Sequence, residues 1–403
     1  MKKPGLLIFS LGTIFSLVAC GSTPKKASKI HLENPSDVSQ CTSNCKAYVD
    51  AMREQHETIE DDYILNNLKG NAGVDIRNYD DVEPGPYSDV STGVDLKFNV
   101  DEGFTAEKYN VKVSLNEDMS DAKEYSVEDG NSVNVNNLFV NKTYYWQVSA
   151  GDEVSEVSSF TTGDYPRWIS AQPLFNVRDN GGYMTSYGKR IKQGLVFRGG
   201  EITTKEFNRS GEKHIKTVTE ESKDVFKNVM KIGVELDLRS ATENEGNYTS
   251  CGFADDGDID YLLCDAGSYE NYINNPKKIV EIFNAFANAD KKPVYYHCYG
   301  GADRTGTVGF LLGAILGMSY TDLVIDFELT SYSSISTRER KRSHLRREGN
   351  WDRWDALISS LTGQATWASE DTLLNNVEKY LNANGVTHDV CEQIRKVMIE
   401  DYE

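Results

Sequence analysis

Basic residues, cysteines and long apolar runs are all scarce in this 403-residue chain. The 43 Lys and Arg residues face 62 Asp and Glu residues, which gives a net charge of −19. This charge argues against nucleic-acid binding, because a phosphate backbone needs a basic face. Seven cysteines exclude a disulfide-built scaffold, and a single apolar stretch of any length excludes a multispan membrane protein. The hydrophobic content of 39% still allows a real core, and the length predicts two or three domains.

The one apolar stretch covers residues 6–19 and follows Lys2 and Lys3. A basic start, a short apolar run and a small residue before a cleavage point are typical of a secretory signal. The tetrapeptide Leu-Val-Ala-Cys that ends at Cys20 resembles a bacterial lipobox. This resemblance implies that residues 1–19 are a lipoprotein signal peptide and that lipid on Cys20 anchors the protein to the extracytoplasmic side of the cell membrane. An ordinary signal peptide, with Cys20 incidental, is the alternative.

Residues 20–84 are expected to form a tether and a helical spacer. Residues 21–29 are small and polar, as in a flexible tether, and residues 46–68 are charge-rich with scattered apolar positions, which suggests a helix. Cys41 and Cys45 lie four residues apart. They could pair in an oxidising compartment, but two cysteines do not specify a metal site.

Residues 85–163 have the pattern of short β-strands. Apolar and polar residues alternate over 94–100, 109–113 and 144–148, which is the period of a half-buried strand. Strands at this spacing, with Asp, Asn and Gly turns, predict a β-sandwich. Residues 138–150 and the closing Phe-Thr-Thr at 160–162 resemble a fibronectin type III module. We expect a spacer or docking module without catalytic residues.

From residue 164 to 403, predicted strands and helices alternate. Residues 234–238 and 293–296 are strand-like, whereas the segment that begins at Pro276 and residues 308–318 are helical. This order predicts an α/β layer fold.

A glycine-rich turn at residues 297–306 joins the second of these strands to the last helix. Cys298 lies at the end of the strand, and small residues allow the backbone amides of the turn to point inward. Such amides and a helix N-terminus form a cradle for anions, including a thiolate. Arg304 closes the turn with a planar group that can hold two phosphate oxygens. The same cradle can therefore activate a nucleophile and hold the group that it attacks.

The sequence His-Cys, five residues and Arg-Thr-Gly is the signature of cysteine-dependent phosphatases. Three further motifs precede it, at residues 176–183, 196–201 and 236–243. Together they resemble the bacterial tyrosine phosphatase family with the His-Cys-x-x-Gly-x-Asp-Arg-Thr-Gly loop, from about Trp168 to the C-terminus. The resemblance implies a central sheet flanked by helices and hydrolysis of phosphomonoesters through a phosphocysteine, with neither metal nor cofactor.

The resemblance also assigns roles. Cys298 matches the nucleophile and Arg304 the phosphate-binding arginine, while Thr305 is placed to hydrogen-bond the sulfur as a leaving group. His297 would support the thiolate from behind, or is a satisfied core histidine. The remaining loop positions are Tyr299, Gly300, Gly301 and Ala302.

The general acid has two candidates. Asp303 lies inside the loop, as in this family, whereas Asp265 lies 298 − 265 = 33 residues before the cysteine, where conventional tyrosine phosphatases carry a mobile acid loop.

Other residues have open roles. Arg178, Asp179, Arg198 and Arg239 either frame the pocket or form salt bridges within the fold. A basic cluster either attracts a polyanionic substrate or is a solvated helix face; it comprises Arg338, Arg340, Lys341, Arg342, Arg346 and Arg347. Cys251 and Cys264 form a disulfide, stay as thiols, or protect Cys298 from overoxidation, and Cys391 is expected in the core.

The sequence thus predicts an envelope-anchored phosphatase of phosphotyrosine or other phosphoesters. Where some relatives have a lysine that suits phosphoinositides, this chain has Ala302, which weakens but does not remove a phosphoinositide or inositol-phosphate reading. A phosphate-binding pseudophosphatase is a further alternative, but a binder does not need the thiol. The partners expected are a phosphorylated protein or small phosphoester and the membrane, with the oligomeric state left open.

Overall fold

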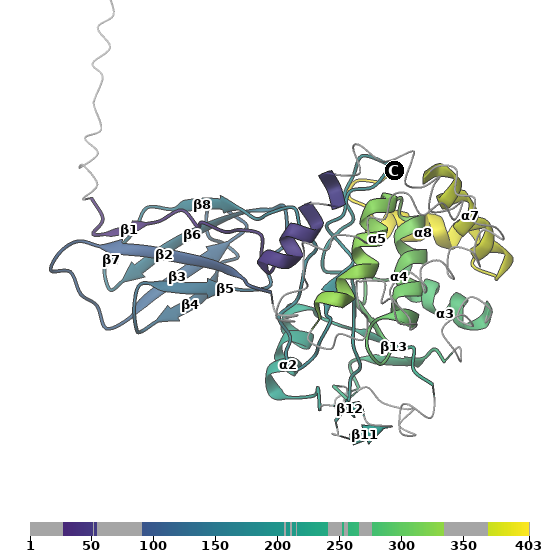
Figure 1. The fold of residues 1–403 in the computed structure, drawn as a ribbon. Helices are drawn as coiled ribbons and strands as arrows, with labels where there is room; N and C mark the ends of the chain where they lie inside the picture. The colour runs from purple at the N-terminus through teal and green to yellow at the C-terminus, as the bar shows by residue number, and fades with distance from the viewer. Residues whose placement is uncertain are drawn as a thin grey trace, which may run out of the picture.

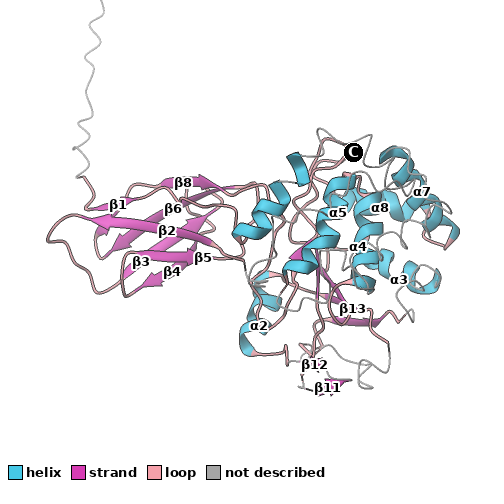
Figure 2. Cartoon of the chain, viewed as in Figure 1, coloured by secondary structure: helices cyan, strands magenta, loops and turns pink. Residues whose placement is uncertain are grey.

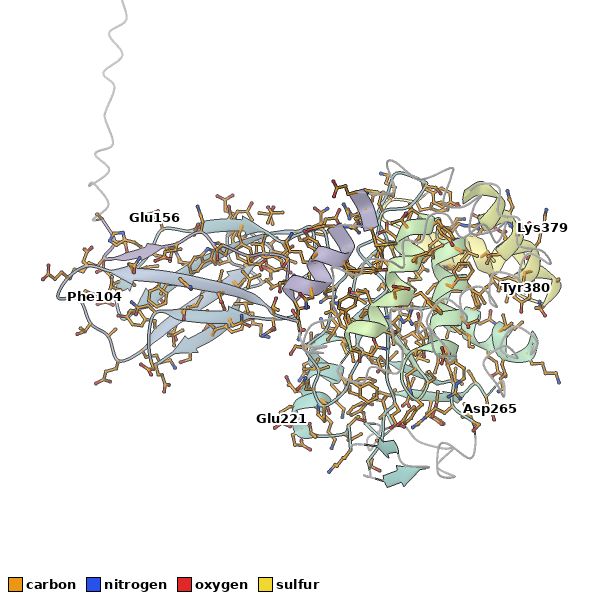
Figure 3. The ribbon with its side chains drawn as sticks, viewed as in Figure 1. Phe104, Glu156, Glu221, Asp265, Lys379 and Tyr380 are labelled. Carbon is orange, nitrogen blue, oxygen red and sulfur yellow. The ribbon has the colours of Figure 1, made fainter. Side chains whose placement is uncertain are left out.

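A computed structural model describes residues 27–50, 52–54, 91–204, 207–209, 212–214, 216–240, 252–253, 257–265, 276–333 and 370–402. An all-β part and a larger α/β part lie side by side, and the far end of the β part, marked by Phe104, points away from the α/β part (Figures 1, 2 and 3). The predicted lipobox with Cys20, the basic cluster at 338–347 and Cys251 fall outside the described residues.

The β part consists of two antiparallel sheets that share one core. The first has the order β1 (Ile30–Leu32), β2 (Val94–Val100), β5 (Ser132–Val135). The second has the order β4 (Lys123–Val127), β3 (Tyr109–Ser114), β6 (Thr143–Ala150), with β7 (Glu153–Val154) and β8 (Ser158–Thr161) both pairing with β6. Alternate residues of the strands are buried, as the sequence period predicts, and Trp146 is fully enclosed in the core. The predicted strands are confirmed.

The α/β part is built on a five-stranded sheet with the order β14-β13-β15-β10-β9. Strands β14 (Asp260–Leu263), β13 (Val234–Asp237), β15 (Val294–His297) and β10 (Val196–Gly199) are parallel, and β9 (Arg178–Asp179) is antiparallel to β10. Strands β10, β13 and β15 are buried along their whole length, as expected for parallel strands covered on both faces. The predicted mixed α/β architecture is therefore confirmed.

Helices cover both faces of this sheet. One core contains side chains of α3 (Pro276–Phe286), α4 (Asp303–Ile315), α5 (Tyr320–Glu328), α7 (Glu370–Ala383) and α8 (His388–Met398). On the opposite face, Phe226 and Met230 of the helical stretch α2 (Glu220–Asp224) and η2 (Val225–Val229) contribute to a second core. A short 3-10 helix, η4 (Leu329–Tyr332), follows α5, and a separate hairpin is formed by β11 (Phe207–Arg209) and β12 (Glu212–His214).

Residues 27–54 differ from the predicted tether and spacer. Strand β1 is a member of the sandwich, paired with β2. Residues 43–50 and 52–54 are helical, and we call them the N-terminal helix. Tyr48, Val49 and Met52 of this helix are buried in the core of the α/β part. The spacer prediction is therefore wrong for these residues, because an apolar stripe on the helix packs against the α/β part.

Arg167 connects the two parts of the chain. Its guanidinium donates hydrogen bonds to the carbonyl oxygens of Asn137 and Leu138 in the sandwich, at 2.8 and 3.1 Å. It also lies 4.3 Å from the ring centre of Phe139 and pairs with Asp179 of β9 at 2.6 Å. One buried cation thus ties a loop of the sandwich to the central sheet of the α/β part.

Among the residues that the structure describes, no helix combines the length and the apolarity needed to cross a membrane.

Candidate active site

The predicted signature loop, residues 298–304, lies where the sheet meets a helix N-terminus. Strand β15 ends at His297, Cys298 follows at once, and α4 begins at Asp303. The carboxyl ends of the parallel strands meet at this edge of the sheet, where active sites of open α/β sheets are found. Cys298 is only 2% exposed, so its sulfur lies at the base of the site.

Close backbone contacts explain the glycines of two motifs. Gly301 has φ +66°, and a Cβ there would lie 2.5 Å from the backbone of Gly199 at the end of β10. A Cβ on Gly200 would lie 2.1 Å from the ring of Phe175. Glycine is therefore needed in the loop for its left-handed conformation and directly after β10 for close packing.

The outward carbonyl groups of the loop are held by the surrounding chain. Asn176 Nδ2 donates to the carbonyl oxygens of Gly300 and Gly301 at 2.9 and 3.2 Å, and Arg198 Nη2 donates to Gly301 at 3.1 Å. The carbonyl oxygen of Tyr299 accepts from the backbone of Glu201 at 3.0 Å. Because C=O and N–H point in opposite directions across a planar peptide, the following amides are turned toward the interior of the loop. The loop is thus pre-formed as an anion cradle.

Arg304 and Thr305 occupy the first turn of α4, and both are buried. Arg304 Nη1 donates to the carbonyl oxygen of Leu238 at 3.4 Å, which fixes the guanidinium beside the loop. The Thr305 hydroxyl has no hydrogen-bond partner in the described part of the chain, so the predicted bond to the Cys298 sulfur is not formed there. A buried hydroxyl without a partner is unusual and is consistent with a ligand or a water at this position.

His297 is fully buried beneath the loop. Its Nε2 lies 2.9 Å from Glu235 Oε1 on β13, and its Nδ1 lies 3.2 Å from the carbonyl oxygen of Cys298. The ring stacks on Tyr295 with centroids 5.5 Å apart. The histidine therefore has a partner for each ring nitrogen within the core, and its support of the thiolate stays a prediction.

The four residues predicted either to frame the pocket or to pair within the fold are all buried and all paired. Arg198 pairs with Asp326, and Arg178 Nε lies 3.5 Å from the same carboxylate. Burial, together with the charge of Arg198, lowers the pKa of Arg178 to about 10. Burial also raises the pKa of Asp179, although the charge of Arg167 opposes the shift.

Arg239 Nη2 pairs with Asp237 Oδ2 at 2.7 Å, and its Nη1 lies 3.2 Å from Glu201 Oε2. Burial alone would raise the pKa of Asp237, but the charges of Arg239 and His297 hold it at about 2. Like the other three residues, Arg239 supports the scaffold, so the salt-bridge alternative fits all four positions.

Asp326 on α5 and Glu235 on β13 were missed by the sequence reasoning. Asp326 is buried within the helix segment Tyr320–Glu328, whose other members are mostly apolar. Three acids, Asp322, Asp326 and Glu328, interrupt this apolar helix, and that pattern is the signal that could have indicated a buried cation. Glu235 lacked an equivalent signal, because its partner His297 is 62 residues away.

The two candidate acids lie at the same edge of the sheet. Asp303 is the first residue of α4. Asp265, which is labelled in Figure 3, follows β14 by two residues. Both residues are half-buried. The choice between them stays a prediction.

A metal site at this position does not fit the residues present. Glu235, Asp237 and His297 each place one ligand atom within 4.8 Å of the others. However, Asp237 accepts four hydrogen bonds from Arg239 and Tyr261, between 2.7 and 3.0 Å. A cation would have to displace Arg239, so the group is better described as an internal charge network.

Five thiols are described, and none forms a disulfide. They are Cys41, Cys45, Cys264, Cys298 and Cys391. Burial raises the pKa of Cys264 to about 12 and that of Cys391 to about 11, so both remain protonated near neutral pH.

A parallel sheet, a loop at its carboxyl edge and an arginine in the following helical turn define an α/β fold of the kind that carries its site at this edge. A family model, the tyrosine phosphatase family, matches residues 169–400, which is more than half of the chain. The chain therefore belongs to the tyrosine phosphatase family and carries a phosphatase domain. No curated protein matches the chain.

Proposed function

We propose that this protein is a cysteine-dependent phosphatase that hydrolyses phosphotyrosine at the outer side of a bacterial cell membrane. The observation that carries the proposal is the position of Cys298, at the base of a loop whose amides face inward and whose far end carries Arg304. These groups match the charge and shape of a phosphate dianion. Membership of the tyrosine phosphatase family supports the same conclusion.

In the first step, the Cys298 thiolate attacks phosphorus opposite the leaving oxygen. The S–P bond forms as the bond between phosphorus and the tyrosine oxygen breaks, and a carboxylic acid gives that oxygen its proton. Arg304 and the loop amides stabilise the charge on the three remaining oxygens. The products of this step are free tyrosine hydroxyl and phosphocysteine.

In the second step, a water attacks phosphorus and the S–P bond breaks. The carboxylate takes one proton from the water, which regenerates the acid and releases inorganic phosphate. The buried Thr305 hydroxyl is then available to donate a hydrogen bond to the departing thiolate.

Asp303 is our first choice for the acid, because it lies within the loop, and Asp265 is the second. Asp303→Asn should slow hydrolysis of phenyl phosphate at least 100-fold. Hydrolysis of p-nitrophenyl phosphate, whose leaving group needs little protonation, should slow much less. If Asp265→Asn gives this pattern and Asp303→Asn does not, the assignment is reversed.

The architecture of the β part supports its interpretation as a fibronectin type III-like module, because a three-stranded antiparallel sheet packs on a second antiparallel sheet.

Anchoring through Cys20 rests on the lipobox alone. Metabolic labelling with a fatty acid should mark the wild-type chain, and Cys20→Ala should release the protein from the membrane fraction.

Phosphate release by the full chain in the presence of a chelator tests the central proposal. We expect hydrolysis of a phosphotyrosine peptide, loss of activity in Cys298→Ser, and activity close to wild type in Cys391→Ser, a matched buried thiol. Activity that survives Cys298→Ser would exclude the cysteine mechanism. Comparison of phosphotyrosine peptide, inositol phosphate and phosphoinositide then ranks the substrates, and binding without turnover would indicate a pseudophosphatase.

A further inference from the structure

The buried pair of Glu235 and His297 is not explained by packing alone. Glu235 lies on β13 and His297 on β15, and these two strands are hydrogen-bonded neighbours in the sheet. The two side chains are 2% and 0% exposed and are joined by the 2.9 Å contact. In the described part of the chain, Glu235 Oε2 has no hydrogen-bond partner. A carboxylate in such a place needs a cation beside it.

Several other charged or titratable groups surround this pair. They are Asp237 and Arg239 at the end of β13, Tyr261 of β14, Tyr295 of β15, Glu201 after β10 and Arg178 of β9. Arg239 pairs with Asp237 and Glu201, and Arg178 lies beside Asp326. Among the described residues, the ion-pair partner of Glu235 is His297 and not an arginine. A protonated His297 supplies a positive charge for this buried carboxylate.

The hydrogen bonds of the ring lead to the same conclusion. Nε2 faces the carboxylate of Glu235, and Nδ1 faces the carbonyl oxygen of Cys298. A neutral imidazole carries one N–H, whereas the imidazolium carries two and can satisfy both oxygens.

We propose that Glu235 is a positioning residue that keeps His297 doubly protonated behind the Cys298 thiolate. The imidazole ring lies between the Glu235 carboxylate and the backbone of Cys298, since Nε2 contacts Glu235 and Nδ1 contacts the carbonyl oxygen of Cys298. A positive ring beside the residue that carries the sulfur favours the thiolate. The inference deepens the proposed function and rests on it for its catalytic meaning.

The rate at which iodoacetamide alkylates Cys298, followed by peptide mass mapping across pH, tests the proposal without turnover. In Glu235→Gln we expect the midpoint of this pH profile to move up by about one unit, so that alkylation at pH 6 slows about ten-fold. The acid limb of kcat/KM should move in parallel. Glu378→Gln is the matched control, because Glu378 also pairs with a histidine, His388, at 2.6 Å, but on α7. Its profile should equal that of the wild type.

A double-mutant cycle separates positioning from a general structural effect. His297→Asn should shift the profile like Glu235→Gln, and the two changes together should shift it no further. Additive shifts, or an unchanged profile in Glu235→Gln, would overturn the proposal.

A measurement on the wild type covers the case in which Glu235→Gln does not fold. The chain has 6 histidines, so selective ¹⁵N labelling gives a simple spectrum, in which His297→Asn identifies the signal of His297. We expect both ring nitrogens of His297 to be protonated at pH 7.5, and a neutral ring would refute the proposal. If Glu235→Gln shifts the alkylation profile but the wild-type chain has no phosphatase activity, the role of Glu235 stands and only the proposed function is refuted.

Discussion

Replacement of Tyr48 with alanine is expected to destabilise the α/β part of the chain while the β-sandwich stays intact. Tyr48 belongs to the N-terminal helix, is 2% exposed, and lies against Tyr332 with ring centroids 5.4 Å apart. Its hydroxyl donates a hydrogen bond to Glu328 Oε2 on α5 at 3.2 Å. The helix therefore supports the segment that carries Asp326 and, through it, the signature loop.

The size of the effect follows from the buried ring. Truncation of a fully buried aromatic side chain to alanine costs about 3–5 kcal/mol, because transfer and cavity terms add. The loss of one hydrogen bond to a carboxylate, which Tyr48→Phe isolates, costs about 1.5–3 kcal/mol. Domains are stable by only about 5–15 kcal/mol, so Tyr48→Ala removes a large share of the total.

Hydrogen exchange followed by mass spectrometry resolves the two parts of the chain. In Tyr48→Ala, exchange should accelerate in α5 and β15 and stay unchanged in β3 and β6. The matched control is Tyr109→Ala, which removes a buried ring that lies 4.9 Å from Phe98 in the sandwich core. It should produce the opposite pattern. Unchanged protection of α5 in Tyr48→Ala would show that the N-terminal helix is not part of the α/β core.

Three further changes probe the loop, the junction and the charge network. Gly301→Ala places a Cβ 2.5 Å from the backbone of Gly199, so turnover should fall about 100-fold, while far-ultraviolet circular dichroism stays near wild type; full activity would contradict the loop geometry. Arg167→Met leaves Asp179 buried without its cation, and chemical denaturation should show a loss of about 3–5 kcal/mol. The pKa of Asp237 lies at about 2, below the ordinary value of 3.8, so its stabilisation is present above pH 4 and is lost as the pH falls toward 2. This amounts to about 2 kcal/mol, and acid titrations of Asp237→Asn should lack that part of the transition.

The chemistry of the site was largely predictable, because its main residues are adjacent in sequence. Cys298, the glycines and Arg304 lie within one turn, and the structure places them in one strand–loop–helix unit. The supports of this turn come from distant segments, such as Asn176, which is 124 residues from the carbonyl group that it binds. The motifs that contain Asn176 and Arg198 were visible in the sequence, but nothing local showed that their side chains bind the outside of the loop.

The N-terminal helix was misread for a different reason. Its apolar residues were treated as scattered, yet Cys45, Tyr48, Val49 and Met52 are spaced by three and four residues and form one helical stripe. The stripe predicts that the helix is packed against something. Its partner lies beyond the whole sandwich in sequence, and no local pattern identifies a contact over that distance.

The path of the chain limits how the sandwich can move against the α/β part. The chain runs from β1 to the N-terminal helix, returns to β2, and leaves β8 for the α/β part, so it passes between the two parts three times. Arg167 adds a buried ionic contact at the same junction. A flexible tether between domains needs a single connection with few contacts, whereas Arg167 makes several contacts across this junction. Because the family match begins at residue 169, a chain cut there would lose the N-terminal helix as well as the sandwich. The core of the α/β part is therefore completed by a helix that lies between the first two strands of the sandwich in sequence.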